Sequence, residues 1–238
     1  MIGTLRTIVI DAPDIGRLAE FYIGLAGWTH GASEDDWITL TTPDGWRIGI
    51  QEAAEHQPPR WPDPAHPQQA HLDLRVPDLE AGAALAVGLG AGLLRKNETW
   101  YTLADPAGHP FDLCLKADDP RTTLMGVMLD CPDAEVLSAF YAELLGKPVT
   151  YQAEGVAMIG DDGAQPVLFQ QVAEYLPPAW PDPARPQQFH LDVTVEDIDA
   201  AERSAFAAGA TRLPGQGENW RVYADPAGKP FCLAWDTE

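Results

Sequence analysis

The sequence repeats itself, and this repeat limits the folds open to the chain more than any other feature does. The segment WPDPAHPQQAHLD, Trp61 to Asp73, returns 119 residues later as WPDPARPQQFHLD, Trp180 to Asp192, with 11 of 13 residues identical. The chain has 238 residues, so this period divides it into two equal halves. We therefore predict two domains, residues 1–118 and residues 119–238.

Each half divides again into two similar modules. An aspartate opens an apolar helical stretch four times, and a glycine follows it 12 or 13 residues later: Asp14/Gly27, Asp78/Gly90, Asp133/Gly146 and Asp197/Gly209. An aspartate caps a helix N-terminus, and a glycine takes the left-handed conformation after the last turn. In the first stretch, the apolar residues lie at i, i+3, i+4 and i+7, which indicates a helix with one buried face: Leu18, Phe21, Tyr22 and Leu25.

The segments around these helices alternate between apolar and polar residues. In His71-Leu72-Asp73-Leu74-Arg75-Val76, every second residue is apolar, which predicts a strand with one face under a helix and one polar face. Further strands are expected at Asp36–Leu40, Arg47–Glu52, Trp100–Ala104 and Pro110–Leu115, with counterparts in the second half. Each module therefore reads β-α-β-β-β, an α+β fold. Between the modules of each half lie proline-rich connectors, and Trp61 and Trp180 are expected to pin them to the body.

The charge and the cysteines exclude several classes of partner. With 36 acidic and 15 basic residues, the net charge is −21, which repels nucleic acid and anionic membranes. The longest uncharged apolar stretch, Ala81 to Leu94, is too short to span a membrane. Three cysteines without a C-x-x-C pair suggest a reducing compartment. We expect a cytoplasmic protein, either a monomer whose halves form an internal pair or a homodimer.

These motifs together resemble the glyoxalase-like (bleomycin-resistance/dioxygenase) domains of the vicinal oxygen chelate superfamily. The resemblance rests on the strand–Asp–helix–Phe-Tyr pattern, the His-Leu-Asp strand, and the Asp-Pro-Ala-Gly turn followed by Pro110-Phe111 or Pro230-Phe231. It covers nearly the whole chain, twice. It implies that the two modules of each half form a cupped eight-stranded sheet that holds a ligand inside. Members of this superfamily include glyoxalase I, extradiol dioxygenases, fosfomycin-modifying enzymes, methylmalonyl-CoA epimerase and drug-sequestering proteins.

The resemblance also implies four positions for metal ligands in each cup, on the first and last strand of each module. By position these are Thr7, Gly49, His71 and Asp112 in the first half, and Gly126, Leu168, His190 and Cys232 in the second. A divalent catalytic site normally uses about three ligands from histidine, carboxylate or thiolate. Threonine, glycine and leucine do not replace them. We therefore expect no metal cofactor, with a divalent metal in domain 1, at His71 and Asp112, as the alternative.

The polar face of the sheet supplies the candidate site residues. His71 and Asp112 are the candidate catalytic residues, because a carboxylate can hold the tautomer of an imidazole and raise its pKa. The candidate ligand-binding residues are Thr7, Arg75, Trp100, His190, Trp220 and Cys232. The two tryptophans would stack on a ligand, and Arg75 would bind a carboxylate unless Asp73 neutralises it. Ordinary packing and hydrogen-bonded wall histidines are the structural alternatives.

Three functions follow from these residues. The first is binding of a small organic molecule in the cup, without the usual divalent metal. The second is a metal-dependent lyase, isomerase or dioxygenase that uses His71 and Asp112. The third is a non-catalytic scaffold whose cups are vestigial. The sequence does not identify the ligand or substrate, because one fold of this kind hosts many chemistries.

Overall fold

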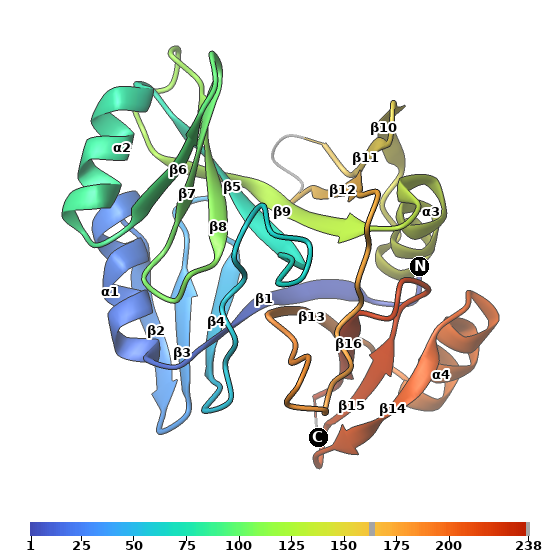
Figure 1. Ribbon diagram of the computed structural model, residues 1–238. Coiled ribbons are helices and arrows are strands. Elements are labelled where there is room, and N and C mark those ends of the chain that lie inside the picture. Colours follow the sequence, from blue (N-terminus) through green and yellow to red (C-terminus); the bar gives the residue numbers. More distant parts are fainter. Residues whose placement is uncertain (162–164, 237–238) are drawn as a thin grey trace.

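In the computed structural model, residues 1–161 and 165–236 are described, and they form four modules of the predicted β-α-β-β-β type (Figure 1). The first module contains β1 (Thr4–Ala12), α1 (Ile15–Ala26), β2 (Thr29–Glu34), β3 (Trp37–Thr41) and β4 (Arg47–Glu52). The second contains β5 (Ala70–Val76), α2 (Leu79–Gly88), β6 (Gly92–Lys96), β7 (Trp100–Ala104) and β8 (Pro110–Leu115). The third contains β9 (Thr123–Cys131), α3 (Ala134–Leu145), β10 (Val149–Ala153), β11 (Val156–Ile159) and β12 (Val167–Gln171). The fourth contains β13 (Phe189–Thr194), α4 (Ile198–Ala207), β14 (Thr211–Gln216), β15 (Trp220–Ala224) and β16 (Pro230–Ala234).

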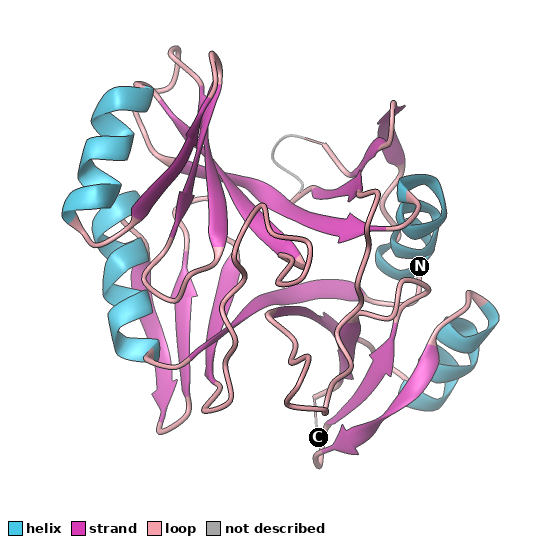
Figure 2. Ribbon diagram, viewed as in Figure 1, coloured by secondary structure: helices cyan, strands magenta, loops and turns pink. Residues whose placement is uncertain are grey.

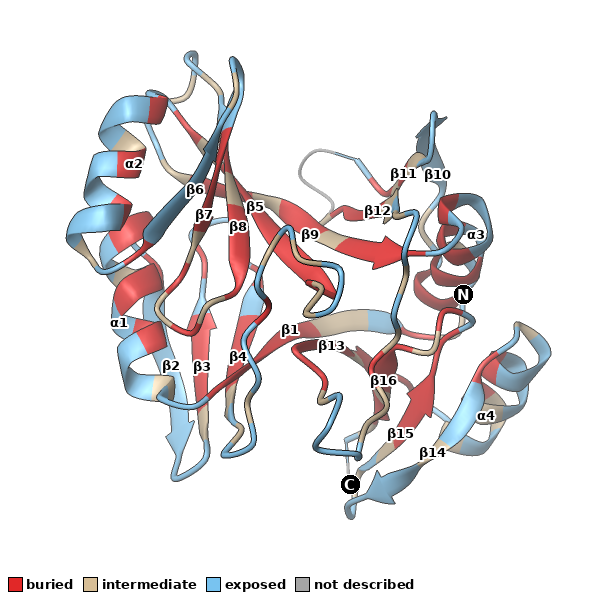
Figure 3. Cartoon of the chain, viewed as in Figure 1, coloured by how far each residue is buried: buried red, intermediate tan, exposed pale blue. Residues whose placement is uncertain are grey.

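The helices begin at the predicted aspartates, and the C-caps of α1 and α3 are the predicted glycines, whereas the C-caps of α2 and α4 lie one residue before theirs. The carboxylate of Asp14 accepts a hydrogen bond from the Arg17 N–H at the start of α1. Gly27 ends this helix in the left-handed conformation, with φ of 65°. Asp78, Asp133 and Asp197 cap the other three helices in the same way. The predicted apolar faces of α1 and α3 are buried against the strands, as Figure 3 shows.

The sixteen strands of the described chain form two eight-stranded mixed sheets. Sheet A has the order β14-β15-β16-β13-β1-β4-β3-β2, and sheet B has the order β10-β11-β12-β9-β5-β8-β7-β6. At the centre of sheet A, β1 pairs with β13 in antiparallel fashion, and β5 pairs with β9 likewise in sheet B. The helices lie on the outer faces of the sheets (Figure 2). The predicted α+β fold class, with β-α-β-β-β modules in eight-stranded sheets, is thus confirmed.

The modules pair differently from our expectation that each half forms its own cup. Sheet A joins the first and fourth modules, and sheet B joins the second and third, so each sheet draws on both halves. The connectors explain this pairing. Only seven residues separate β8 from β9, so modules two and three stay in one sheet, whereas 17 residues separate β4 from β5 and β12 from β13. These long connectors carry the chain from one sheet to the other.

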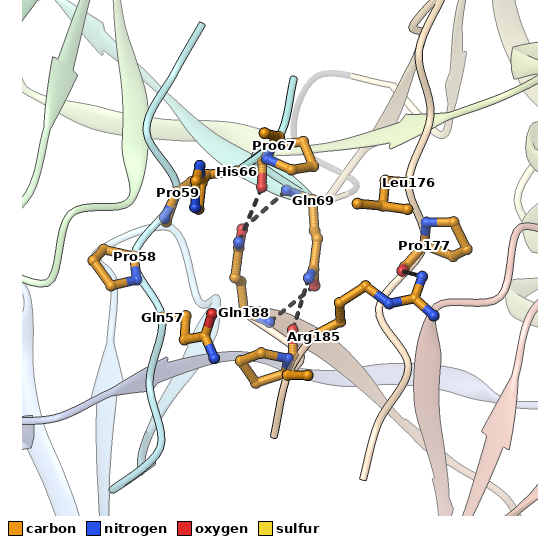
Figure 4. Close-up of a pocket in the computed structure, with 13 residues that line it drawn as sticks. Gln57, Pro58, Pro59, His66, Pro67, Gln69, Leu176, Pro177, Arg185 and Gln188 are labelled. Carbon is orange, nitrogen blue, oxygen red and sulfur yellow. Dashed lines mark hydrogen bonds between the residues drawn. The ribbon is translucent and has the colours of Figure 1, made fainter. Parts of the chain in front are cut away.

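The two connectors meet at a clasp between the halves, which Figure 4 shows. The backbone N–H of Gln69 donates to the side-chain oxygen of Gln188 over 3.0 Å, and the N–H of Gln188 donates to the side-chain oxygen of Gln69 over 2.9 Å. The side-chain amide of Gln69 also donates to the carbonyl of Pro186, and that of Gln188 to the carbonyl of Pro67. The second glutamine of the repeated PQQ motif therefore joins the two halves.

Candidate functional site

A cavity of about 480 Å³ opens on the face of sheet A that is turned away from the helices. Its lining comes from the first and fourth modules and from the connector between modules three and four. Period-two alternation places these side chains there: on β1, Ile8 and Ile10 face the helices and are fully buried, so Thr7 faces the cavity. A volume of this size is typical of pockets for small organic ligands.

Three tryptophans, Trp37, Trp180 and Trp220, form much of the cavity wall. The indole of Trp37 lies so close over Gly49 that a Cβ atom at this glycine would overlap the ring. The indole of Trp220 lies over Gly217 in the same way. The Trp37 ring is fixed further by its N–H, which donates to the Thr39 hydroxyl over 2.9 Å. These aromatic walls are therefore positioned before any ligand binds.

The polar floor of the cavity spans three neighbouring strands. Thr7 on β1 pairs with Asp192 on β13, which in turn pairs with Cys232 on β16. His190 lies two residues before Asp192, on the same face, with its Nε2 atom 3.6 Å from the carboxylate. Imidazole, carboxylate and thiol lie within 4.8 Å of one another. Burial and the neighbouring Asp192 carboxylate raise the pKa of the Cys232 thiol well above its usual value, so the thiol keeps its proton.

The first glutamine of the repeated motif fixes the histidine in each sheet. The amide of Gln187 lies 3.2 Å from Nδ1 of His190 and donates to the buried Asp11 carboxylate over 3.3 Å. An amide N–H that points at Nδ1 makes this nitrogen the acceptor, so the proton of the neutral ring is on Nε2, facing Asp192. In sheet B, Gln68 contacts His71 and Asp130 in the same arrangement. Burial raises the pKa of Asp11 to about 6.

Sheet B carries a second cluster at the equivalent place. Nε2 of His71 on β5 lies 3.5 Å from Asp73 and 3.9 Å from Asp112. Asp73 and Asp112 are direct neighbours in the β5–β8 register. Burial by itself lowers the pKa of His71, but the two carboxylates outweigh it and raise this pKa to about 9. The metal-free imidazole therefore carries a proton between two carboxylates, one of which, Asp112, has its own pKa raised by burial.

The two clusters differ in how well they fit a divalent metal ion. In sheet B, His71, Asp73 and Asp112 offer one nitrogen and two carboxylates within 4.8 Å of one another, a donor set that a hard divalent ion accepts. In sheet A, the third donor is the protonated thiol of Cys232, which is already hydrogen-bonded to Asp192. The residues of sheet B thus offer a hard divalent ion two carboxylates, whereas those of sheet A offer one carboxylate and a thiol that would have to lose its proton on coordination.

The structure corrects the sets of positions that we assigned to each cup. Thr7 and Gly49 share sheet A with His190 and Cys232, not with His71 and Asp112, because β1 pairs with β13. Gly126 and Leu168 lie in sheet B with His71 and Asp112. Two of the four positions are apolar in sheet B, where the Leu168 side chain covers Gly126.

The individual candidate residues fall into three places. The cavity of sheet A brings together Thr7, His190, Trp220 and Cys232. His71 and Asp112 meet in sheet B, and Trp100, 40% exposed, lies on β7 of the same sheet. Arg75 lines a separate pocket of about 150 Å³ with Lys116 and Arg121, between β5, β9 and the β3–β4 turn.

Sequence reasoning did not single out several residues of these sites. Trp37 and Asp36 line the cavity of sheet A, and Asp73 and Asp192 complete the two clusters. Asp73 and Asp192 could have been found from the sequence, because the alternation that placed His71 on the polar face also placed Asp73 there. Trp37 had no such signal, since its counterpart in the repeat is Val156. Trp180, expected only to pin its connector, also lines the cavity.

No described helix combines the length and the apolar character that crossing a membrane requires.

A search among curated proteins finds no significant match. Among solved structures, glyoxalase I from Zea mays matches over 97% of this chain and 92% of its own, with a TM-score of 0.70 and 16% identity. A putative dioxygenase from Bacillus subtilis matches over 99% of this chain and 86% of its own, with a TM-score of 0.62 and 12% identity. At such identities these likenesses concern the fold alone.

The comparison with family models gives the stronger result. The model of the glyoxalase-like domain matches twice, over residues 7–114 and 126–234. The two matches cover most of the chain and follow its internal repeat. The chain therefore belongs to the glyoxalase-like domain family.

Proposed function

We propose that this protein binds a small organic molecule with a planar portion in the cavity of sheet A, without a divalent metal. The single observation that carries the proposal is the cavity of about 480 Å³ with three tryptophans on its wall. Aromatic side chains bind planar groups by stacking, and each well-placed pair contributes about 0.5–1.5 kcal/mol beyond the area it buries. Gly49 and Gly217 hold two of these rings in place, which lowers the entropy lost on binding.

The floor of the cavity supports this proposal because it supplies directed polar groups. The Asp192 carboxylate accepts a hydrogen bond from a donor on the ligand, such as a hydroxyl or an amine. The Thr7 hydroxyl, two strands from Cys232, both donates and accepts. At the family's metal positions, sheet A has Thr7 and Gly49 beside His190 and a protonated Cys232. Such a set favours recognition by hydrogen bonds over metal coordination.

The test is a binding screen with planar aromatic and heteroaromatic compounds, followed by tryptophan fluorescence and by calorimetry. We expect saturable binding that weakens about tenfold or more in Trp220→Ala, the loss expected for one stacking anchor. Trp100→Ala is the matched control, because Trp100 takes the equivalent place in sheet B. Absence of saturable binding would overturn the proposal and favour a scaffold with vestigial cups. Equal losses in both variants would overturn the assignment of the ligand to sheet A.

A second candidate function is favoured by the cluster in sheet B. His71, Asp73 and Asp112 would hold a divalent ion of the Mn²⁺ or Fe²⁺ type, which would supply Lewis-acid chemistry for a lyase, isomerase or dioxygenase. In the metal-free protein, the Nε2–H group of His71 faces the two carboxylates, so metal binding at this nitrogen releases its proton. Metal analysis of protein purified without chelators tests this candidate. Asp73→Asn should remove about one equivalent, and a metal content unaffected by the substitution would exclude it.

A further inference from the structure

The first half contains two buried imidazole nitrogens without a hydrogen-bond partner, outside both clusters described above. They are Nδ1 of His56, in the connector after β4, and Nδ1 of His109, after the turn that joins β7 to β8. The two rings lie 4.9 Å apart, and the His109 side chain is completely buried. Unpaired polar atoms in a protein interior are rare, and each needs an explanation such as a bound ion or water.

The contact that the other nitrogen of each ring, Nε2, makes determines which of the two nitrogens carries the hydrogen. Nε2 of His56 lies 2.8 Å from the carbonyl oxygen of Ala107, and Nε2 of His109 lies 2.7 Å from that of Asp11. A carbonyl oxygen only accepts hydrogen bonds, so each Nε2 carries the hydrogen. In the neutral ring, Nδ1 is then a bare lone pair. Two such lone pairs on rings 4.9 Å apart form a donor set for a metal ion, and neutral imidazole is the commonest metal ligand.

The internal repeat shows what occupies the equivalent place in the second half. Tyr175 corresponds to His56, and Lys229 corresponds to His109. The Lys229 ammonium is buried, lies 5.2 Å from the centre of the Tyr175 ring, and donates to the carbonyl oxygen of Gln69. The second half therefore places a positive charge at this point of the fold. Where the second half has an ammonium group, the first half has two electron-pair donors.

The surrounding carboxyl groups are kept in both halves. Asp225, whose charge acts on Lys229, corresponds to Asp105 beside His109. Asp105 accepts the backbone N–H groups of Ala107 and His109, as Asp225 accepts those of Ala227 and Lys229. With a histidine in place of the lysine, this carboxyl group has no ammonium group beside it. A bound cation beside His109 would restore the balance of charge found in the second half.

We propose that His56 and His109 bind a transition-metal ion through their Nδ1 atoms, at the place that the Lys229 ammonium takes in the second half. With metal–nitrogen bonds of about 2.0 Å along the lone pairs, ring centres 4.9 Å apart correspond to a nitrogen–metal–nitrogen angle of about 100°. This angle is close to that of a tetrahedral site, so Zn²⁺ or Cu⁺ would bind both imidazoles, with water or another small ligand completing the coordination. His56 is only half-buried, so the ion has a route of entry.

The experiment compares the wild-type protein with His56→Tyr/His109→Lys, a double variant that copies the second half and should therefore fold. Both are titrated anaerobically with Cu⁺ and, separately, with Zn²⁺, and bound metal is measured after gel filtration. We expect the wild type to hold one equivalent more than the variant for one of the two metals. His71→Ala serves as control, because it removes the sheet B cluster and leaves the two-histidine site intact.

A second measurement does not depend on any variant. In ¹⁵N-labelled wild-type protein, metal should shift the Nδ1 resonances of His56 and His109 while their Nε2–H resonances persist. The proposal is overturned if wild type and double variant bind equal amounts of both metals. It is also overturned if the two Nδ1 resonances do not respond to metal, which is the result for a site filled only by water.

Discussion

Removal of the clasp between the halves offers a quantitative test of how the two sheets are joined. Gln69→Ala deletes the side-chain oxygen that accepts the Gln188 N–H over 2.9 Å and the amide that donates to Pro186 over 2.8 Å. Gln188→Ala deletes the two symmetry-related bonds. Both side chains are buried, with exposed fractions of 7% for Gln69 and 5% for Gln188.

The expected loss in the free energy of unfolding follows from the hydrogen-bonding groups that each substitution leaves without a partner. In Gln69→Ala, the Gln188 N–H stays buried without an acceptor, which costs about 1–3 kcal/mol, and the lost bond to Pro186 adds about 1 kcal/mol. We therefore expect the free energy of unfolding to fall by about 2–4 kcal/mol in either single variant. Each side chain bonds to the backbone N–H of the other glutamine, so the two residues form one network and their losses should not add simply in the double variant.

The assay is urea unfolding, followed by circular dichroism and by tryptophan fluorescence. At an m-value of about 2–3 kcal/mol per molar urea, the midpoint of each single variant should fall by about 1 M. Gln57→Ala is the control, because its exposed side chain also reaches across the halves, donating over 2.6 Å to the carbonyl of Pro183. That variant should lose no more than about 0.5 kcal/mol. If Gln69→Ala loses no more than the control, the clasp does not stabilise the pairing of the halves.

Three further predictions follow from particular contacts. Gly49→Ala should displace the Trp37 indole and weaken ligand binding to sheet A about tenfold by calorimetry, without changing the far-ultraviolet spectrum; an unchanged Kd would contradict the role of this ring. Tyr22→Phe and Tyr141→Phe should each lower the free energy of unfolding by about 1–2 kcal/mol, because each hydroxyl donates over 3.0 Å to a buried aspartate; no loss in either variant would refute this. In metal-free protein, the His71 ring should titrate near pH 9 by NMR; a folded-state pKa raised from 6.5 stabilises the fold fully below pH 6.5, and this stability is lost as the pH rises through 9. A midpoint at or below 6.5 would show that Asp73 and Asp112 do not act on the ring.

Local structure could be read from the sequence because its signals are local. An aspartate such as Asp14 caps the helix that follows it, and Gly27 ends that helix through its own backbone conformation. The alternation around His71 placed its side chain on the polar face of β5, where the structure has it. Each of these outcomes depends on a few residues that are close together in the chain.

The pairing of modules depends on contacts that the repeat makes ambiguous. Four similar modules can pair with one another in several combinations. The identity between Trp61–Asp73 and Trp180–Asp192 does not distinguish between these combinations. The informative signal was the length of the connectors, since the short segment between β8 and β9 joins modules of one sheet. The polar character of that segment had suggested a domain boundary instead. Trp37 in the wall of the sheet A cavity was missed for a related reason, because the repeat has Val156 and not a tryptophan at the corresponding position.

Because each sheet takes one module from each half, the two cups could diverge although the halves stayed alike. Sheet A combines Trp37 from the first module with Cys232 from the fourth, and sheet B combines Asp112 from the second with Leu168 from the third. A substitution in one module thus changes a single cup, while the connectors and their clasp keep both cups in register. The central pairs β1–β13 and β5–β9 also join the two halves, so each cup of this structure contains strands from both. A candidate site therefore belongs to a cup, to which each half contributes one module.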